Sequence, residues 1–215
     1  MIKRLLLLLC LIATAGSTAW ADIASGTFKN GGTWKISDAG ELYVDAVTVP
    51  DYDMTSYKRD YYDDEDCDLD GIFYPRPINT SPWYGYMPRI KKIRLSNKVT
   101  TVGEFAFAGL RMVSQVVVEG SGLTLKDWSF YGCFRLVDFP FSNGEVSHIG
   151  VQAFWHCGFF RPLVLNGVSS IDSNAFEQCF HLWRDSKSSI PSIVIKGNQY
   201  PTVGKMNDYS KGYSE

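Results

Sequence analysis

The feature that most constrains this sequence is a dipeptide, alanine or serine followed by phenylalanine, that returns every 22 to 24 residues. It occurs at Ala106-Phe107, Ser129-Phe130, Ala153-Phe154 and Ala175-Phe176. A fixed period of roughly 20 to 29 residues is typical of chains that wind into stacked coils, because one coil cannot bury its apolar side alone. The sequence therefore predicts a repeat architecture over this region rather than a set of unrelated helices and strands.

Other apolar positions keep the same period. Triplets with apolar first and third residues recur at 93–95, 116–118, 139–141, 163–165 and, after an insertion, 193–195. Each triplet predicts a short strand, and such strands stack in parallel about 4.8 Å apart. We therefore expect a mainly β solenoid with short helical or 3-10 turns and about four to five coils. The repeated phenylalanines should form one internal column.

Two segments of the repeat resemble a known family. Val102-Gly103-Glu104-Phe105-Ala106-Phe107 and Ile149-Gly150-Val151-Gln152-Ala153-Phe154-Trp155-His156-Cys157 resemble the consensus turn of the BspA-like leucine-rich repeats of bacterial surface proteins. Ser25-Gly26-Thr27, the hairpin around Trp34 and Pro82-Trp83-Tyr84-Gly85-Tyr86 resemble the segment before such repeats. The resemblance covers about residues 25 to 196. It implies a leucine-rich-repeat fold and a role in adhesion or host-protein binding, and it implies no catalytic residue.

The first 21 residues have the composition of a secretory signal peptide. Lys3 and Arg4 precede an apolar run from Leu5 to Ala13, and Ala19-Trp20-Ala21 provides a small-residue cleavage site. A short buried core helix is the alternative, but such a helix would alternate apolar and polar residues. We therefore expect an exported chain, which is periplasmic, at the cell surface or extracellular.

The rest of the chain divides by pattern. Residues 22–88 predict an N-terminal β cap with an acidic loop, residues 89–196 the repeats, and residues 197–215 a C-terminal closure or tail. Within the cap, apolar residues alternate on both sides of Asp38-Ala39-Gly40, which predicts a β-hairpin over 22–45. Its expected role is to cover the apolar end of the first coil.

The mature chain keeps four cysteines, and four cysteines in an exported protein favour disulfide bonds. Cys133, Cys157 and Cys179 share the slot that Leu110 fills in the first copy, so this slot suits a small or medium apolar group. A disulfide needs converging Cβ atoms about 3.8 Å apart, whereas stacked strands hold equivalent side chains parallel. We expect buried free thiols, with a disulfide and a zinc site completed by a histidine as alternatives. Cys67 would be a lone thiol in the acidic loop.

Composition excludes several classes of protein. The formal net charge is -2, which disfavours a nucleic-acid partner because phosphate recognition needs a basic face. The sequence is 45% hydrophobic, which disfavours disorder of the whole chain. The nine residues from Leu5 to Ala13 are too few to cross a bilayer, so we expect no transmembrane segment in the mature chain.

The acidic loop contains a candidate calcium site. Asp66, Asp68 and Asp70 precede Gly71 in the D-x-D-x-D-G pattern that begins a calcium-binding loop. The twelfth position should be a bidentate glutamate but is Pro77, and no helix pattern flanks the loop. The alternative is a solvated acidic loop without a metal. Apart from the zinc alternative at the repeat cysteines, calcium is the candidate cofactor, and otherwise we expect none.

The candidate binding surface consists of the residues that point away from the core in the predicted strands. Four of the five central triplet positions are apolar, and an apolar stripe on an open sheet face favours contact with a partner. A covering tail, or valine chosen for its strand propensity, is the alternative. Proline in the third triplet would also remove a ladder donor and make that coil irregular. The candidate residues are Arg94, Gln115, Val117, Asp138, Pro140, Val164, Asn166 and Val194.

No motif in the sequence indicates catalysis. The sequence pairs no nucleophile with a base except the adjacent His156 and Cys157, whose side chains should point apart, so we expect no enzyme. His156 itself is expected in a variable surface turn. Two hypotheses remain. The first is a cell-surface binding module that holds a protein or a glycan on the strand face. The second is a structural or assembly domain that uses this face for homo-oligomerisation or for packing on another surface protein.

The calcium hypothesis makes a direct prediction. Millimolar calcium should raise the melting temperature, because a cation that binds only the folded chain stabilises it. The shift should disappear in the double variant Asp66→Asn and Asp68→Asn, measured by differential scanning fluorimetry. The same melting temperature with calcium and with a chelator would contradict the hypothesis.

Overall fold

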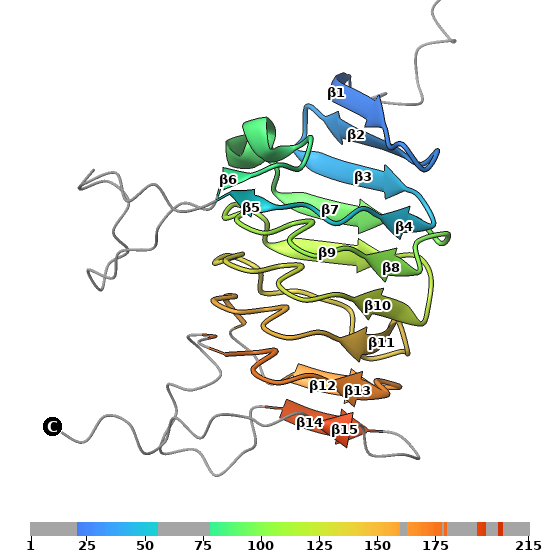
Figure 1. The fold of residues 1–215 in the computed structure, drawn as a ribbon, viewed down its shortest axis with the longest axis vertical. Coiled ribbons are helices and arrows are strands. Elements are labelled where there is room, and N and C mark those ends of the chain that lie inside the picture. The colour runs from blue at the N-terminus through green and yellow to red at the C-terminus, as the bar shows by residue number, and fades with distance from the viewer. Residues whose placement is uncertain are drawn as a thin grey trace, which may run out of the picture.

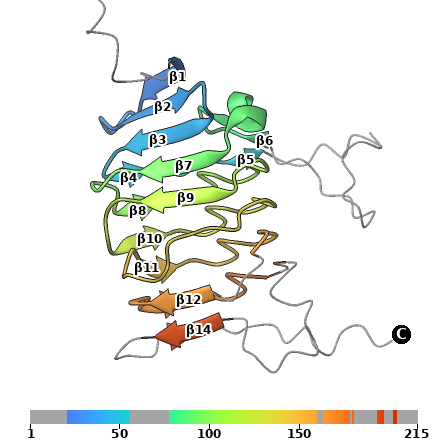
Figure 2. The same cartoon turned by 180° about the vertical axis from the view of Figure 1, so that it is seen from behind.

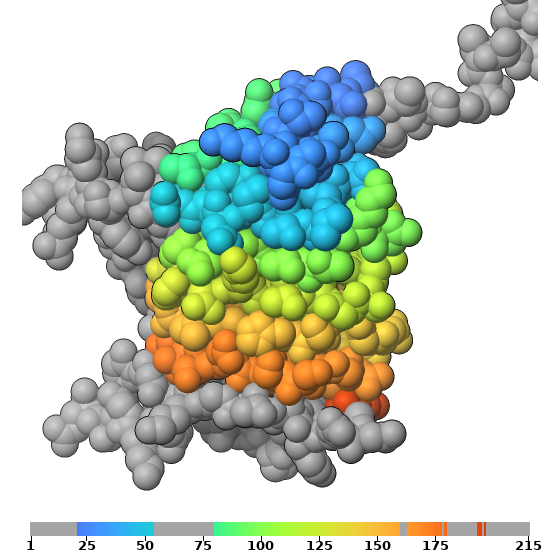
Figure 3. Space-filling view, turned by 45° about the vertical axis from the view of Figure 1, so that its right-hand side comes forward, coloured from blue at the N-terminus to red at the C-terminus, as the bar shows by residue number. Residues whose placement is uncertain are grey.

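The structure, a computed structural model, describes residues 21–55, 78–159, 163–177, 179, 193–196 and 202–203. These residues are mainly β, and the 3-10 helix η2 (Tyr84–Arg89) packs beside the N-terminal strands (Figure 1). The chain winds into coils that follow one another along the long axis, so the colours form successive bands from blue to orange (Figure 3).

One side of the stack carries a five-stranded sheet in the order β1-β2-β3-β7-β9. Its strands are β1 (Asp22–Thr27), β2 (Thr33–Ser37), β3 (Glu41–Asp45), β7 (Lys92–Leu95) and β9 (Gln115–Val118). The β1–β2 and β2–β3 pairs are antiparallel, whereas β3, β7 and β9 are parallel. Further along this side, β12 (Leu163–Asn166) pairs in parallel with β14 (Ile193–Lys196) (Figure 2). We call the outward surface of these strands the strand face.

A second, six-stranded sheet has the order β15-β13-β11-β10-β8-β4, and all its pairs are parallel. Its strands are β4 (Thr48–Val49), β8 (Thr101–Val102), β10 (Leu123–Leu125), β11 (Val146–Ile149), β13 (Ser170–Ile171) and β15 (Thr202–Val203). The short strands β5 (Met54–Thr55) and β6 (Ile78–Asn79) form a separate antiparallel pair. Its inward residues include one buried apolar residue four positions before each Ala-Phe or Ser-Phe dipeptide: Val102, Leu125, Ile149 and Ile171.

The predicted phenylalanine column is confirmed. Phe107, Phe130, Phe154 and Phe176 are buried, and successive ring centroids lie 5.1, 5.4 and 5.3 Å apart. The column extends by one ring that we did not predict, because Trp83 stacks on Phe107 at 5.3 Å. The Trp83 indole N–H also donates a hydrogen bond of 2.9 Å to the carbonyl of Ala106. Trp83 lies 24 residues before Phe107, so the repeat period itself marks this position.

The three described repeat cysteines are buried free thiols, as predicted. Each thiol donates to a backbone carbonyl in the preceding coil: Cys133 to Phe107 at 3.3 Å, Cys157 to Phe130 at 3.3 Å, and Cys179 to Phe154 at 3.0 Å. Burial raises the pKa of Cys133 and of Cys179 to about 12, and it also raises the pKa of Cys157. The thiols therefore stay protonated and pack between coils.

The triplet at 139–141 was predicted to form a strand, and this is wrong. Phe139 and Phe141 point into the core, but the residues have no strand conformation, and only an isolated bridge from Gln115 to Asp138 continues the ladder. Pro140 has no N–H to donate to β9, which is the irregularity that the sequence indicated. As a result, β9 and β12 belong to separate sheets.

The predicted hairpin is present as β2 and β3, and β1 adds a further antiparallel strand. β3 has a second partner, because it also pairs in parallel with β7, and β4 pairs with β8. The residues between Glu41 and Val49 therefore contribute strands to both sheets, although no Ala-Phe dipeptide marks them.

A buried serine provides a test of the repeat slots. Ser129 occupies the slot held by Ala106, Ala153 and Ala175, and its buried hydroxyl finds no hydrogen-bond partner among the described residues. Ser129→Ala should therefore raise the free energy of unfolding by about 1 kcal/mol, because it removes an unsatisfied buried polar group. Urea denaturation of the two proteins measures the difference, and a less stable variant would contradict the assignment of this slot.

The buried thiols predict a loss of stability at alkaline pH. An unfolded cysteine loses its proton near pH 8.5, whereas burial keeps Cys133 and Cys179 protonated up to a pKa of about 12. The folded-state pKa is the higher one, so the free energy of unfolding should fall as pH rises above about 8.5. Denaturation at pH 7, 8.5 and 9.5 should show a smaller decline in the triple alanine variant of Cys133, Cys157 and Cys179. Equal declines in the two proteins would refute this explanation.

Candidate binding surface

Cross-strand register arranges the strand face in rows. Glu41, Lys92 and Gln115 lie opposite one another in β3, β7 and β9, and the next outward row contains Tyr43, Arg94 and Val117. The residues between these rows point into the core, and Leu42, Ile93 and Val116 are buried there. Alternation along each strand thus places polar and charged side chains outside a continuous apolar layer.

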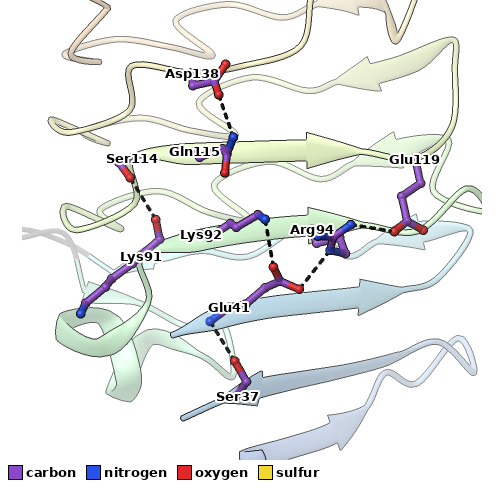
Figure 4. A network of polar contacts seen from close by, with 9 residues as sticks. All are labelled: Ser37, Glu41, Lys91, Lys92, Arg94, Ser114, Gln115, Glu119 and Asp138. Atoms are coloured by element: carbon purple, nitrogen blue, oxygen red, sulfur yellow. Dashed lines mark hydrogen bonds and ion pairs between the residues drawn. The ribbon is translucent and has the colours of Figure 1, made fainter. Parts of the chain in front are cut away.

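Arg94 is held between two carboxylates on this face (Figure 4). Its Nε lies 3.0 Å from Glu41 Oε1, and its Nη1 lies 3.2 Å from Glu119 Oε1. Lys92 Nζ adds a contact of 3.2 Å to the other oxygen of Glu41. Burial opposes ionisation of Glu41, but hydrogen bonds from Arg94 and Lys92 outweigh it, so the pKa of Glu41 lies below its ordinary value. The guanidinium is therefore fixed in the middle of the face.

Gln115 and Asp138 extend this polar network towards the next coil. The side-chain amide of Gln115 donates a hydrogen bond of 2.8 Å to Asp138 Oδ2 (Figure 4). The backbone N–H of Val116 also donates to the carbonyl of Asp138, at 2.9 Å. Asp138 is thus held at the point where the ladder ends, and the structure brings together Arg94, Gln115 and Asp138 from the predicted set.

The remaining predicted residues lie on both sides of the interruption. Val117 lies in β9 opposite Arg94, and Pro140 lies in the interruption itself. Val164 pairs with Val194, and Asn166 pairs with Lys196, in the separate β12–β14 sheet. Asn166 donates a side-chain hydrogen bond of 3.0 Å to the carbonyl of Ser142. Each of the four apolar candidates is half-buried: Val117, Pro140, Val164 and Val194. Val117 lies before the irregular coil that contains Pro140, and Val164 and Val194 lie after it.

Sequence reasoning missed the part of the strand face that the N-terminal hairpin provides. Ser25, Lys35 and Tyr43 lie opposite one another in β1, β2 and β3, and Tyr43 in turn lies opposite Arg94. The alternation of the hairpin marked Lys35 and Tyr43 as outward, but the parallel pairing of β3 with β7 could not be read from it. The strand face therefore begins well before the first Ala-Phe repeat.

The second sheet carries an outward row that the sequence analysis did not anticipate. Thr101, Thr124, His148 and Ser170 lie opposite one another. The Ser170 hydroxyl lies within hydrogen-bond distance of His148 Nδ1, and Asp172 Oδ2 lies 3.4 Å from His148 Nε2. A nucleophile therefore lies beside a base, contrary to what we expected outside His156 and Cys157, because Ser170 and His148 meet in adjacent strands although they are 22 positions apart. In a Ser-His-Asp triad the serine hydroxyl bonds to Nε2 and the aspartate to Nδ1. Here the two are exchanged, with Ser170 at Nδ1 and Asp172 at Nε2.

Two further expectations concern histidine and metal ligands. His156 was expected on the surface but is buried, with its ring against Trp155 and Phe134. Its neighbour Cys157 bonds to the backbone instead, so the two do not form a dyad.

Within the described part of the chain, no three histidine, cysteine, aspartate or glutamate side chains gather as a metal site. Asp66, Asp68 and Asp70 lie outside the described residues.

The signal-peptide prediction for residues 1–21 and the lone thiol Cys67 also fall outside the described residues, except for Ala21. Residues 197–201 and 204–215 of the predicted C-terminal closure do so as well. Among the residues that the structure describes, no helix combines the length and apolar composition that crossing a bilayer requires.

Comparison with known proteins places this geometry in a family. The family model described as a BspA type leucine-rich repeat region matches residues 78–198 with 6 copies. A search of curated proteins finds no match. Among solved structures, the chain is similar to a leucine-rich repeat protein from Eubacterium ventriosum, with 18% identity and a TM-score of 0.48. The alignment covers 81% of this chain and 45% of the other, so this chain spans less than half the length of that protein.

The family match covers more than half of the chain, and within it the coils stack with one shared column of aromatic rings. The chain therefore belongs to the family of BspA-type leucine-rich repeat proteins.

Proposed function

We propose that this chain is a non-catalytic binding module that recognises a protein or a glycan through its strand face. Leucine-rich repeats support this role, because stacked coils build an extended open sheet whose outward side chains do not contribute to the core. The proposal includes export by residues 1–21 and adhesion-type recognition outside the cell. It also assigns the hairpin segment 22–45, which contains β1, β2 and β3, to capping the end of a stack of about four to five coils.

The observation that carries this proposal is the fixed position of Arg94 at the centre of the strand face. Two carboxylates hold the guanidinium, and Tyr43 and Val117 lie on either side of it in register. Arginine and tyrosine are enriched among the residues that contribute most to binding energy in protein interfaces. A side chain that is already held in place loses less conformational entropy when a partner binds.

The half-buried valines complete the surface. Val117 lies beside the charged network, and Val164 and Val194 lie beyond the irregular coil around Pro140. An apolar contact with a polar rim is the usual composition of an interface that must also stay soluble when it is free. The ion pairs would then orient the partner, while burial of the valines would supply affinity.

The test is capture of extracellular matrix proteins and immobilised glycans by the labelled mature chain. Val117→Asp should weaken capture at least about tenfold, because it puts a charge into the apolar part of the interface. Val47→Asp is the matched control. Val47 is 63% exposed in the turn between β3 and β4, where a charge remains in water. Equal capture by the two variants would contradict the proposal.

The competing structural role has a distinct outcome. A stable dimer at micromolar concentration in light scattering, dissociated by Val117→Asp but not by Val47→Asp, would show that the strand face binds a second copy. That result would replace recognition of a partner by homo-oligomerisation.

A further inference from the structure

A shallow depression lies at the N-terminal end of the strand face, on the outward side of β1, β2 and β3. The side chains of Ser25, Thr27, Thr33, Lys35, Tyr43 and Asp45 surround it. Gly26 and Trp34 also line it. None of these residues belongs to the surface that the sequence predicted.

Register explains why these side chains gather. Ser25, Lys35 and Tyr43 lie opposite one another in one row, and Thr27, Thr33 and Asp45 in the next. Between the rows, Gly26 lies opposite the buried Trp34. A Cβ at Gly26 would lie 2.8 Å from Trp34 Nε1, so glycine lets the indole pack directly against the backbone of β1. Ser25, Thr27 and Thr33 have short side chains, which leaves the surface hollow beside Lys35, Tyr43 and Asp45.

The lining is dense in hydrogen-bonding groups and balanced in charge. Four hydroxyls accompany one ammonium group and one carboxylate. Hydrogen bonds from Lys98 and Ser96 lower the pKa of Asp45, so this carboxylate is an ionised acceptor at neutral pH. Burial and the nearby acids Glu119 and Asp45 raise the pKa of Tyr43, so its phenol keeps a proton to donate. Lys35 Nζ lies 3.8 Å from Asp22 Oδ1, so the carboxylate of Asp22 offsets the positive charge of Lys35.

This chemistry selects among classes of ligand. A phosphorylated ligand would meet the carboxylate of Asp45 beside Lys35, so the depression offers it no net positive charge. A purely apolar ligand would leave the hydroxyls without partners, which is costly. A sugar ring has hydroxyls around its rim and an apolar C–H face, so it matches a lining that combines hydroxyl, ammonium and carboxylate groups with the aromatic ring of Tyr43.

We propose that this depression is a carbohydrate-binding subsite that holds one sugar unit of a glycan on the strand face. The inference rests on the proposed function, because Tyr43 lies directly opposite Arg94 and a longer glycan would continue across that residue. It names the ligand class of that surface and gives the hairpin a role beyond capping.

The test uses the full mature chain and methyl glycosides of glucose, galactose, mannose, fucose and N-acetylglucosamine. Saturation-transfer NMR should detect binding of at least one of them at millimolar concentration. Thr33→Val should weaken that binding about tenfold, which corresponds to the loss of one hydrogen bond. Tyr43→Ala should weaken it at least as much. Thr101→Val is the matched control, because it removes an outward hydroxyl from β8 in the other sheet.

Melting temperatures establish that each variant is folded, and Thr33→Val provides the test even if Tyr43→Ala does not fold. Absence of transfer to every sugar would overturn the subsite, as would equal affinity in Thr33→Val and Thr101→Val. If no sugar binds but protein capture still depends on Val117, only the carbohydrate inference fails. If capture also ignores Val117→Asp, the proposed function fails with it.

Discussion

The structure depends on contact between coils that are each too thin to enclose a core. Trp83 and the four phenylalanines of the repeat stack ring on ring, with centroids 5.1 to 5.4 Å apart. Backbone ladders between parallel strands run alongside this column on both sides of the stack, and their spacing of about 4.8 Å is close to that of the rings. The stability of each coil therefore comes mainly from its neighbours, and the outward side chains can vary without loss of the fold.

The strand face shows how this freedom is used. Arg94 forms ion pairs with Glu41, which lies 53 positions earlier in the sequence, and with Glu119, which lies 25 positions later. These residues come together because β3, β7 and β9 lie side by side. Ion pairs with such exposure contribute little to folding. Their main effect is to give a long side chain one orientation on a surface that is otherwise open. The hollow over Gly26 adds shape to the N-terminal end of the same surface, on β1, β2 and β3.

Much of the core followed from the sequence. The period identified the phenylalanine column, the cysteine slot and the irregular coil at Pro140, because all three are local consequences of repetition. The same period would have identified Trp83 had tryptophan been accepted in the phenylalanine slot. The hairpin was also evident, but not its membership of the parallel sheet, since no spacing within residues 22–45 specifies a partner near residue 93. The buried position of His156 was missed because its turn resembled variable surface turns.

The sequence by itself determined which residues of the strands and of the phenylalanine and cysteine slots face inward, because alternation and period act within one coil. Only the tertiary structure decided which outward residues are neighbours. Strand register brings together the side chains of three pairs: Glu41 and Arg94, Ser170 and His148, and Lys35 and Tyr43 at the depression. Register is fixed by packing of the whole stack, in which a slip of one residue would turn every buried side chain outward. The candidate surfaces therefore became visible only when the coils were placed against one another.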